Sequence, residues 1–260
     1  MIEFNQQIGV TETDDAGLNL SWESKLRKAN ILITKEVNDN FIEAVMRNEN
    51  YKRIIIHATV TGWGGTAMEP GVPRMPWSHM QINKLIENGF PVSQLVLRID
   101  PIIPSSLGLK RVRDVLGRFS NTGISRVRVS ILDLYYHTKQ RIQSICQSQS
   151  TMFKSDYRIP YWTFNAPEDI QDLVAETLEP YQDCYYIDTC NEGYLADKLG
   201  IKPTGCVSQN DLEILGITDI KLEGQGRQRK GCMCPNNKVQ LLGGYHGRCK
   251  HNCAYCYIKD

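Results

Sequence analysis

The residues from Arg53 to Thr61 read RIIIHATVT and form the clearest strand pattern in the chain. Successive side chains of a strand point to opposite faces. One face of this strand carries Ile54, Ile56, Ala58 and Val60, and the other carries His57, Thr59 and Thr61. An apolar face opposite a polar one predicts a strand that meets helices on one side. Its other side would line the interior of an open barrel.

Further strands are predicted at residues 8–13, 30–35, 94–100, 126–133 and 185–188. Helical patterns alternate with them, at residues 39–47, 77–88, 106–119, 138–149, 166–178, 192–199 and 208–215. This alternation favours an α/β fold with a mostly parallel sheet and helices outside. About six strands are too few for a closed eight-stranded barrel, so the sequence predicts a partial β/α barrel.

From Gly224 onward Gly, Gln, Asn and basic residues dominate, and regular periodicity ends. We therefore expect a partial barrel over residues 1–223 and a cluster-binding tail over residues 224–260, packed on the barrel. The hydrophobic content of 41% and charged content of 23% are ordinary for a globular protein. A net charge of +1 gives no overall indication of nucleic-acid or membrane binding. No apolar run approaches the ~20 residues that span a bilayer. The N-terminus does not resemble a secretory signal, so we expect a cytoplasmic protein.

The tail contains three cysteines, Cys249, Cys253 and Cys256, at Cys-x-x-x-Cys-x-x-Cys spacing. A loop of this length can wrap three thiolates around one corner of an iron–sulfur cluster. Cube-type clusters normally take four cysteines, so one iron would stay open to an outside ligand. The alternative is a structural zinc loop, completed by His246 or His251.

Four more cysteines stand in the C-terminal third, namely Cys190, Cys206, Cys232 and Cys234. Their number suits a second iron–sulfur cluster or a tetrahedral zinc. The alternative is that they are buried thiols packed as small hydrophobes, the role expected of Cys146 and Cys184. Basic residues lie near the cysteines in sequence, and they either offset the charge of a cluster or bind an anionic substrate. They are Arg227, Arg229, Lys230, Lys238, Arg248 and Lys250.

Arg98 and Asp100 lie two residues apart at the end of the 94–100 strand, where β/α barrels place active sites. Either they form a pair that closes the barrel mouth, or Arg98 holds a carboxylate while Asp100 orients a hydroxyl or amine. The further catalytic candidates are His57 and Asp133. Cofactor contacts are predicted at Thr61 and at the Gly62 and Gly64 loop, for which a plain turn is the alternative.

The terminal loop, with Tyr255 before its third cysteine, resembles the signature of radical S-adenosylmethionine enzymes. The resemblance implies a [4Fe–4S] cluster whose open iron binds S-adenosylmethionine and cleaves it to a 5′-deoxyadenosyl radical. It also implies a reductant such as flavodoxin or ferredoxin. In most members the motif follows the first barrel strand, whereas here it follows the predicted barrel.

The motif order over about residues 30 to 260 also resembles the bacterial family catalogued as domain of unknown function 1848. The motifs are TVTGWG at 59–64, EPGVP at 69–73, LRIDPI at 97–102, SILDLY at 130–135, CNE at 190–192 and CMC at 232–234, with the terminal loop. The reaction of that family is unknown, so the substrate stays open. The alternatives are a non-catalytic zinc or iron–sulfur module and a nucleic-acid binding or modifying protein. Polar residues inside a barrel favour an enzyme, because each must be hydrogen-bonded or lowers stability.

Overall fold

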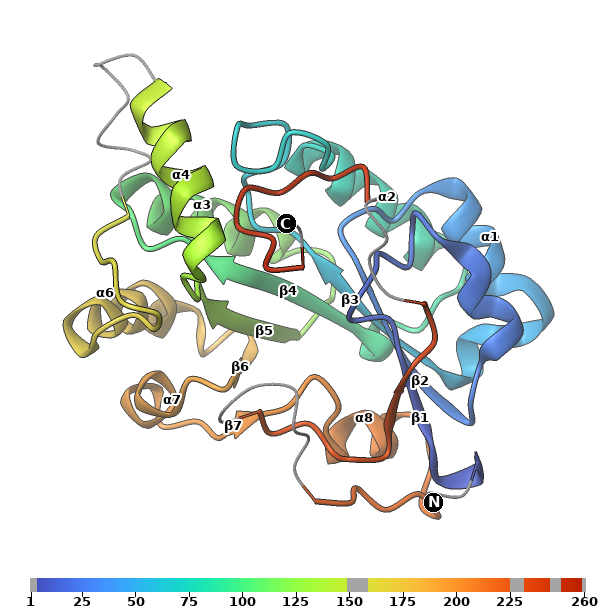
Figure 1. The fold of residues 1–260 in the computed structure, drawn as a ribbon. Helices are drawn as coiled ribbons and strands as arrows, with labels where there is room; N and C mark the ends of the chain where they lie inside the picture. Colours follow the sequence, from blue (N-terminus) through green and yellow to red (C-terminus); the bar gives the residue numbers. More distant parts are fainter. Residues whose placement is uncertain (1–3, 149–158, 225–231, 244–248, 259–260) are drawn as a thin grey trace.

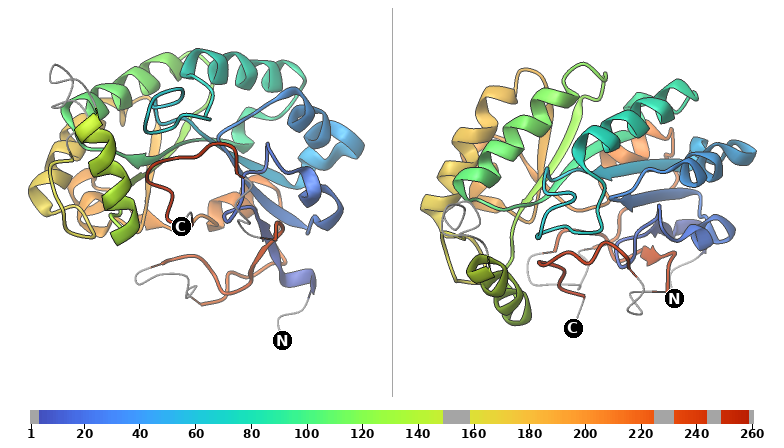
Figure 2. Two further views of the ribbon diagram at one scale, coloured as in Figure 1. Left: turned by 45° about the horizontal axis from the view of Figure 1, so that its top comes forward. Right: turned by 90° about the horizontal axis from the view of Figure 1, so that it is seen from above.

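The computed structural model describes residues 4–148, 159–224, 232–243 and 249–258. Eight parallel strands form one sheet in the order β7-β6-β5-β4-β3-β2-β1-β8 (Figure 1). They are β1 (Ile8–Val10), β2 (Ala29–Thr34), β3 (Ile54–Thr59), β4 (Leu95–Ile102), β5 (Arg126–Ile131), β6 (Tyr186–Cys190), β7 (Pro203–Thr204) and β8 (Lys238–Gln240). The sheet curls into a half-barrel, and the helices that follow the central strands lie on its outer side (Figure 2).

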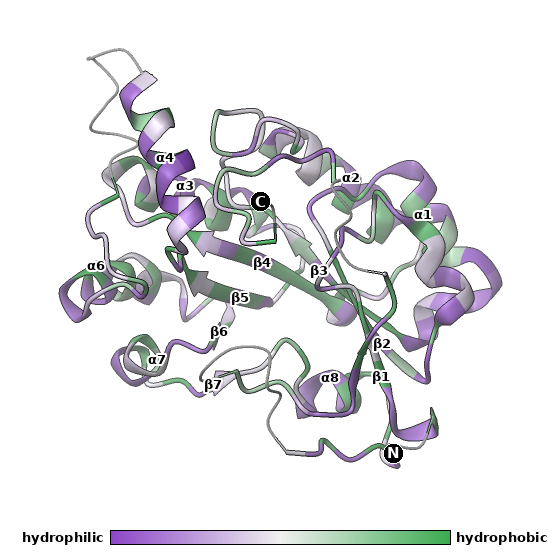
Figure 3. Cartoon of the chain, in the orientation of Figure 1, coloured by the Kyte–Doolittle hydropathy of each residue, from purple (hydrophilic) through white to green (hydrophobic). Residues whose placement is uncertain are grey.

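The described helices are α1 (Asp39–Met46), α2 (Met75–Glu87), α3 (Ser106–Phe119), α4 (Tyr136–Ser148), α6 (Glu168–Leu178), α7 (Gly193–Leu199) and α8 (Gln209–Ile214). The apolar face of β3 packs against the outer helices, as its alternation predicts. Ser105 caps α3, because its hydroxyl accepts a hydrogen bond from the Gly108 amide at 3.0 Å. Figure 3 shows apolar strands covered by helices with polar outer faces. Within the described residues, no helix is long and apolar enough to cross a membrane.

The strand count predicted from sequence is wrong, because the sheet has eight strands rather than about six. The two missed strands, β7 and β8, are only two and three residues long. Such short strands carry no detectable periodicity and form only because the sheet edge offers backbone partners. β8 pairs in parallel with β1, with Lys238 opposite Ile8. The cysteine-rich tail therefore contributes a strand to the sheet.

The interior of the half-barrel is apolar at one end and polar toward the carboxyl ends of the strands. Ile55 and Val96 belong to an inner apolar cluster with Leu212 of α8. Further along the strands, one register row carries Thr59, Arg98, Arg128 and Asp188. The fully buried Arg128 forms two hydrogen bonds to Asp188, at 2.5 and 2.7 Å. This charged row forms the base on which the cavity of the next section rests.

Candidate functional site

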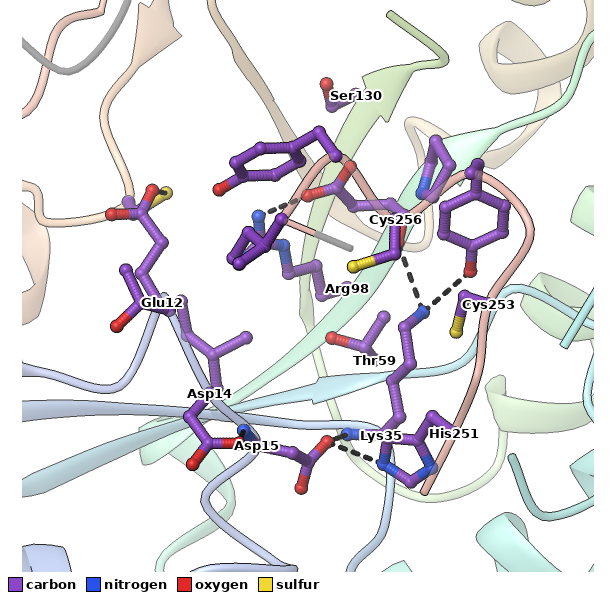
Figure 4. Close-up of a pocket in the computed structure, with 18 of the residues that line it drawn as sticks. Glu12, Asp14, Asp15, Lys35, Thr59, Arg98, Ser130, His251, Cys253 and Cys256 are labelled. Atoms are coloured by element: carbon purple, nitrogen blue, oxygen red, sulfur yellow. Dashed lines mark hydrogen bonds and ion pairs between the residues drawn. The ribbon is translucent and has the colours of Figure 1, made fainter. Parts of the chain in front are cut away.

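A cavity of about 480 Å³ opens at the carboxyl ends of the strands (Figure 4). Loops after β1, β2, β5 and β7 line it, together with the end of β6 and the terminal segment. Its size lies within the ~300–1,000 Å³ typical of small-molecule and cofactor sites. All seven cysteines after Asp188 reach its wall, namely Cys190, Cys206, Cys232, Cys234, Cys249, Cys253 and Cys256. The fold thus brings both predicted cysteine sets to one cavity.

The terminal segment is tied to the loop that follows β3 by backbone hydrogen bonds. The Ala254 amide donates to the Met68 carbonyl at 2.9 Å, and the Gly71 amide donates to the His251 carbonyl at 3.0 Å. No side chain fits at Gly71, because a Cβ there would lie 2.0 Å from the Lys250 oxygen. On the other side, the rings of Tyr257 and Tyr135 stack with centroids 5.4 Å apart. These contacts hold the three-cysteine loop across the cavity mouth.

Both ring nitrogens of His251 are used in hydrogen bonds. One faces the Gly71 carbonyl at 3.2 Å, and the other faces the Asp15 carboxylate at 2.9 Å. Both partners are acceptors, so this arrangement favours the imidazolium form, in which both ring nitrogens donate. Burial disfavours this charged form, but the hydrogen bond and charge of Asp15 outweigh it and raise the pKa of His251. Neither nitrogen is available to a metal in this arrangement.

Lys35 follows β2 and reaches the cavity beside the cysteine loop (Figure 4). Its ammonium donates to Glu69 and to the Tyr255 hydroxyl, each at 2.9 Å. Tyr255 also donates to Glu69, which accepts a third hydrogen bond from Thr61 at 2.7 Å. Burial opposes the ammonium form of Lys35, but the charges of Glu69 and then Cys253 raise its pKa. A permanent positive charge therefore lies close to Cys253.

Arg98 and Asp100 both line the cavity and form a salt bridge with each other. The Arg98 side chain is 10% exposed and that of Asp100 is 23% exposed. Burial disfavours the Arg98 cation, but the charges of Asp100, Cys206 and Cys190 raise its pKa. The guanidinium therefore stays charged while it faces the cavity.

Cys190, Cys206, Cys232 and Cys234 form one buried cluster. The Cys206 amide donates to the sulfur of Cys234 at 3.1 Å. Thiol hydrogen bonds from Cys190 and Cys234 lower the pKa of Cys206 well below its usual range, with help from Arg98 and Lys238. Across the part of the chain that the structure describes, no three His, Cys, Asp or Glu side chains are arranged to hold a metal ion. Metal binding by either cysteine set stays a prediction.

The family described as a domain of unknown function (DUF1848) matches residues 19–258. The chain belongs to this family. No curated protein and no solved structure matches the chain. The family match includes all seven cysteines of the cavity wall, whereas Glu12 and Asp15 lie before it. Because the family description names no activity, the function must be inferred from the site itself.

In this DUF1848 chain, some of the predicted catalytic and cofactor residues do not line the cavity. Arg98, Asp100, Asp133 and Tyr255 do line it, whereas His57, Thr61, Gly62 and Gly64 do not. Thr61 is bonded to Glu69, and a Cβ on Gly62 would lie 2.9 Å from that of Arg111 in α3. A Cβ on Gly64 would lie 1.9 Å from the Pro73 oxygen. These contacts fit a packed turn.

His57 is fully buried beneath the charged row. Neither of its ring nitrogens has a hydrogen-bond partner among the described residues. Burial lowers the pKa of His57 well below its usual range, and the neighbouring Arg128 lowers it further. The ring is therefore neutral and lies below the cavity rather than in it.

Sequence reasoning missed Asp15, Lys35 and Glu69 as parts of the site. Asp15 lies in a segment without periodicity, and Lys35 and Glu69 follow strands by one and ten residues. Only the docking of the tail shows that they support the cysteine loop. Among the predicted basic residues, Lys238 pairs with Glu12 at 2.6 Å and Lys250 is exposed. Arg227, Arg229, Lys230, Arg248 and the predicted zinc ligand His246 lie outside the described residues.

Proposed function

We propose that this chain is a radical S-adenosylmethionine enzyme that uses Cys249, Cys253 and Cys256 to hold an iron–sulfur cluster at the cavity mouth. The predicted cofactors are a [4Fe–4S] cluster and S-adenosylmethionine. The substrate is a molecule small enough to share a cavity of about 480 Å³ with the cofactor. The half-barrel and the spacing of the three cysteines support this proposal.

The observation that carries the proposal is the hydrogen bonding of His251. The zinc alternative needs a fourth ligand, and His251 is the predicted candidate within the described residues. Its two ring nitrogens are bound to Gly71 and Asp15. Among the described residues, the loop therefore offers three thiols without a free histidine, the ligand set that leaves one iron of a cube-type cluster open.

The shape and charge of the loop also suit a cluster. Asn252 has a φ of 51°, in the left-handed region, so the chain turns sharply between the first two cysteines. Burial raises the pKa of Cys253, and the Lys35 ammonium opposes that rise. Thiolates are the ligating form, so a nearby fixed cation favours binding. When bound, the cluster would supply the electron that splits S-adenosylmethionine into methionine and a 5′-deoxyadenosyl radical.

The remaining cavity residues have roles that follow from their positions. The Arg98 guanidinium faces the cavity and can hold a carboxylate of the cofactor or substrate by a two-point hydrogen bond. Asp100 orients Arg98 and accepts from a hydroxyl or amine. Asp133, hydrogen-bonded by Asn165 at 3.0 Å, lines the cavity beyond β5. Tyr255 and Tyr257 line the cavity, and their rings would limit the space open to water there.

The test is anaerobic reconstitution with iron and sulfide, followed by incubation with dithionite and S-adenosylmethionine. We expect a brown protein, an EPR signal of the reduced state that changes on adding S-adenosylmethionine, and formation of 5′-deoxyadenosine. The Cys253→Ala variant should lose the response of the EPR signal to S-adenosylmethionine and the formation of 5′-deoxyadenosine. The exposed Cys184 lies away from the cavity, so Cys184→Ala is the matched control and should keep them.

A colourless protein with one zinc bound at the terminal loop would contradict the proposal. Equal 5′-deoxyadenosine formation by wild type and Cys253→Ala would also contradict it. Zinc content after aerobic purification alone is not decisive, because exposed clusters are lost in air and zinc then competes for free thiolates. Zinc content is therefore measured on protein that was kept anaerobic from cell lysis onward.

A further inference from the structure

The four-cysteine cluster lies at the seam between the two edges of the half-barrel. Cys190 is the last residue of β6, and Cys206 follows the edge strand β7 by two residues. Cys232 and Cys234 precede β8, which is the opposite edge strand of the sheet. Three segments far apart in the sequence thus meet through their thiols, where the barrel is otherwise open.

The two edges approach each other closely at these cysteines. A Cβ on Gly205 would lie 2.8 Å from both the Cα and the nitrogen of Cys234, so only glycine fits there. The Cys206 amide donates to the Cys234 sulfur across the same gap. No backbone pairing between β7 and β8 is present in the described sheet, whose order ends at these two strands. Side-chain contacts therefore make this junction.

The composition of the cluster argues against simple apolar packing. All four side chains are buried, at 8, 1, 8 and 1% exposure, and the cluster contains no other hydrophobic residue. Thiols that act as small hydrophobes would mix with aliphatic neighbours. Cys232 and Cys234 are two residues apart, which allows an extended chain to present both on one face. Two ion pairs lie at this part of the cavity. Arg98 and Asp100 both line it, and Glu12, which also lines it, pairs with Lys238.

We propose that Cys190, Cys206, Cys232 and Cys234 bind a thiolate-ligated metal centre that joins the β7 and β8 edges and closes the half-barrel. The four thiols are clustered, but among the described residues no three side chains are already arranged to hold a metal ion, so binding would draw the sulfurs together. Four cysteine thiolates are the ligand set of a complete iron–sulfur cluster and of structural zinc. In an iron–sulfur cluster or a zinc site of this kind, cysteines fill every ligand position of the metal. No position is left for a substrate, so the centre stabilises the fold. It also faces the cavity that holds the terminal loop. This proposal does not rest on the proposed catalytic function.

The test replaces the three terminal cysteines and measures how much metal the protein still binds. In the Cys249→Ala, Cys253→Ala, Cys256→Ala protein, purified and reconstituted anaerobically, we expect one metal centre per chain. About four iron and four sulfide identify a cluster, and about one zinc identifies a zinc site. Adding Cys206→Ser or Cys234→Ser should abolish this centre. Adding Cys184→Ser, at an exposed thiol, should leave it unchanged.

A second measurement, hydrogen exchange, shows which part of the fold the metal centre stabilises. Hydrogen exchange at the amides of β8 and of residues 204–206 should speed up at least tenfold when the centre is removed by Cys206→Ser, while β3 stays protected. A folded triple-alanine protein that takes up neither iron nor zinc would overturn the proposal. If that variant fails to fold, the metal content of the wild-type chain decides. Two centres support the proposal, and a single centre lost in Cys253→Ala overturns it.

Discussion

Arg98 illustrates how one side chain can serve both the fold and the site. It lies in the charged row beneath the cavity, bonded to Asp100, and its pKa is raised by Asp100, Cys206 and Cys190. If the Arg98–Asp100 pair only closed the barrel mouth, the two side chains would need opposite charges and close packing, but they would not need to contact the cavity. Here both members line the cavity. This exposure favours a binding role over a purely structural pair.

We expect Arg98→Lys to keep cluster content and thermal stability while turnover falls. Lysine retains the charge but loses the planar fork that binds a carboxylate at two points. A lost hydrogen bond to a charged group is worth ~1.5–3 kcal/mol, which corresponds to a decrease of about 10- to 100-fold. The measurement is 5′-deoxyadenosine formation, with iron content and melting temperature as controls. Loss of folding without a separate turnover defect would support the structural pair instead.

His57 gives a prediction about pH. Burial and the Arg128 charge hold its pKa well below the usual range, so the folded chain does not take up the proton that the unfolded chain binds near pH 6.5. Its contribution to stability is complete above about pH 6.5 and is lost as the pH falls. At pH 5.5 the loss is at most about 1.4 kcal/mol, the limit for a group with an unfolded pKa near 6.5.

The measurement compares wild type and His57→Leu by urea unfolding at pH 7.5 and 5.5. The decrease in the free energy of unfolding should be smaller in the variant, by at most about 1.4 kcal/mol. Using the difference between the two proteins cancels the other histidines, including His251, whose raised pKa acts in the opposite direction. An identical pH dependence in both proteins would show that His57 titrates normally in the folded chain.

Strands β5 and β6 are joined by a buried ion pair as well as by their backbone ladder. Arg128 is fully buried, and its two hydrogen bonds to Asp188 neutralise a charge that the interior could not otherwise hold. Alternation along β5 and β6 is compatible with placing both residues on one face of the sheet. It does not show that they are partners, because that depends on the register between two strands 60 residues apart.

We expect Asp188→Asn to lower the free energy of unfolding by about 3 kcal/mol, because Arg128 is then left as an unpaired buried charge. Urea denaturation at neutral pH measures the change. The control is Lys110→Gln, which breaks the exposed Lys110–Asp114 pair on α3 and should change stability very little. If both substitutions have similar small effects, the buried pair contributes nothing specific to joining the strands.

Across the whole molecule, the beginning and end of the described chain are joined. β1 pairs with β8, and Asp15 binds His251 from 236 residues away. Asp15 also accepts from the Gly17 and Lys35 amides at 2.8 and 2.7 Å, so it is held rigidly before His251 meets it. The cysteine loop is thereby positioned over strands formed by the first half of the sequence.

We expect Asp15→Asn to loosen the terminal loop without unfolding the barrel. A weakened charged hydrogen bond of ~1.5 kcal/mol or more should raise trypsin cleavage after Lys250 at least about tenfold, since cleavage follows the open population. Peptide mass spectrometry measures the rate. Asp172→Asn, which breaks an exposed pair with Lys198, should leave the rate unchanged. Equal cleavage in all three proteins would show that Asp15 does not hold the loop.

Much of the architecture follows from local pattern. The period-two alternation at residues 54–59 determines which side chains meet the helices, since that choice depends only on strand geometry. The same holds for the Ser105 cap and for the order of strands and helices. β7 and β8 could not be found this way, because two or three residues contain no period and acquire strand geometry only from a neighbour.

The sequence by itself determined the α/β class, the inward-facing Arg98 and Asp100, and the spacing of Cys249, Cys253 and Cys256, because each depends on pattern along short stretches. Only the tertiary structure decided which of these residues meet. It brings seven cysteines to one cavity, engages His251 with Asp15, and leaves His57 buried below that cavity. The physical reason is that such contacts join segments far apart in the chain. Their geometry is set by the curl and register of the whole sheet.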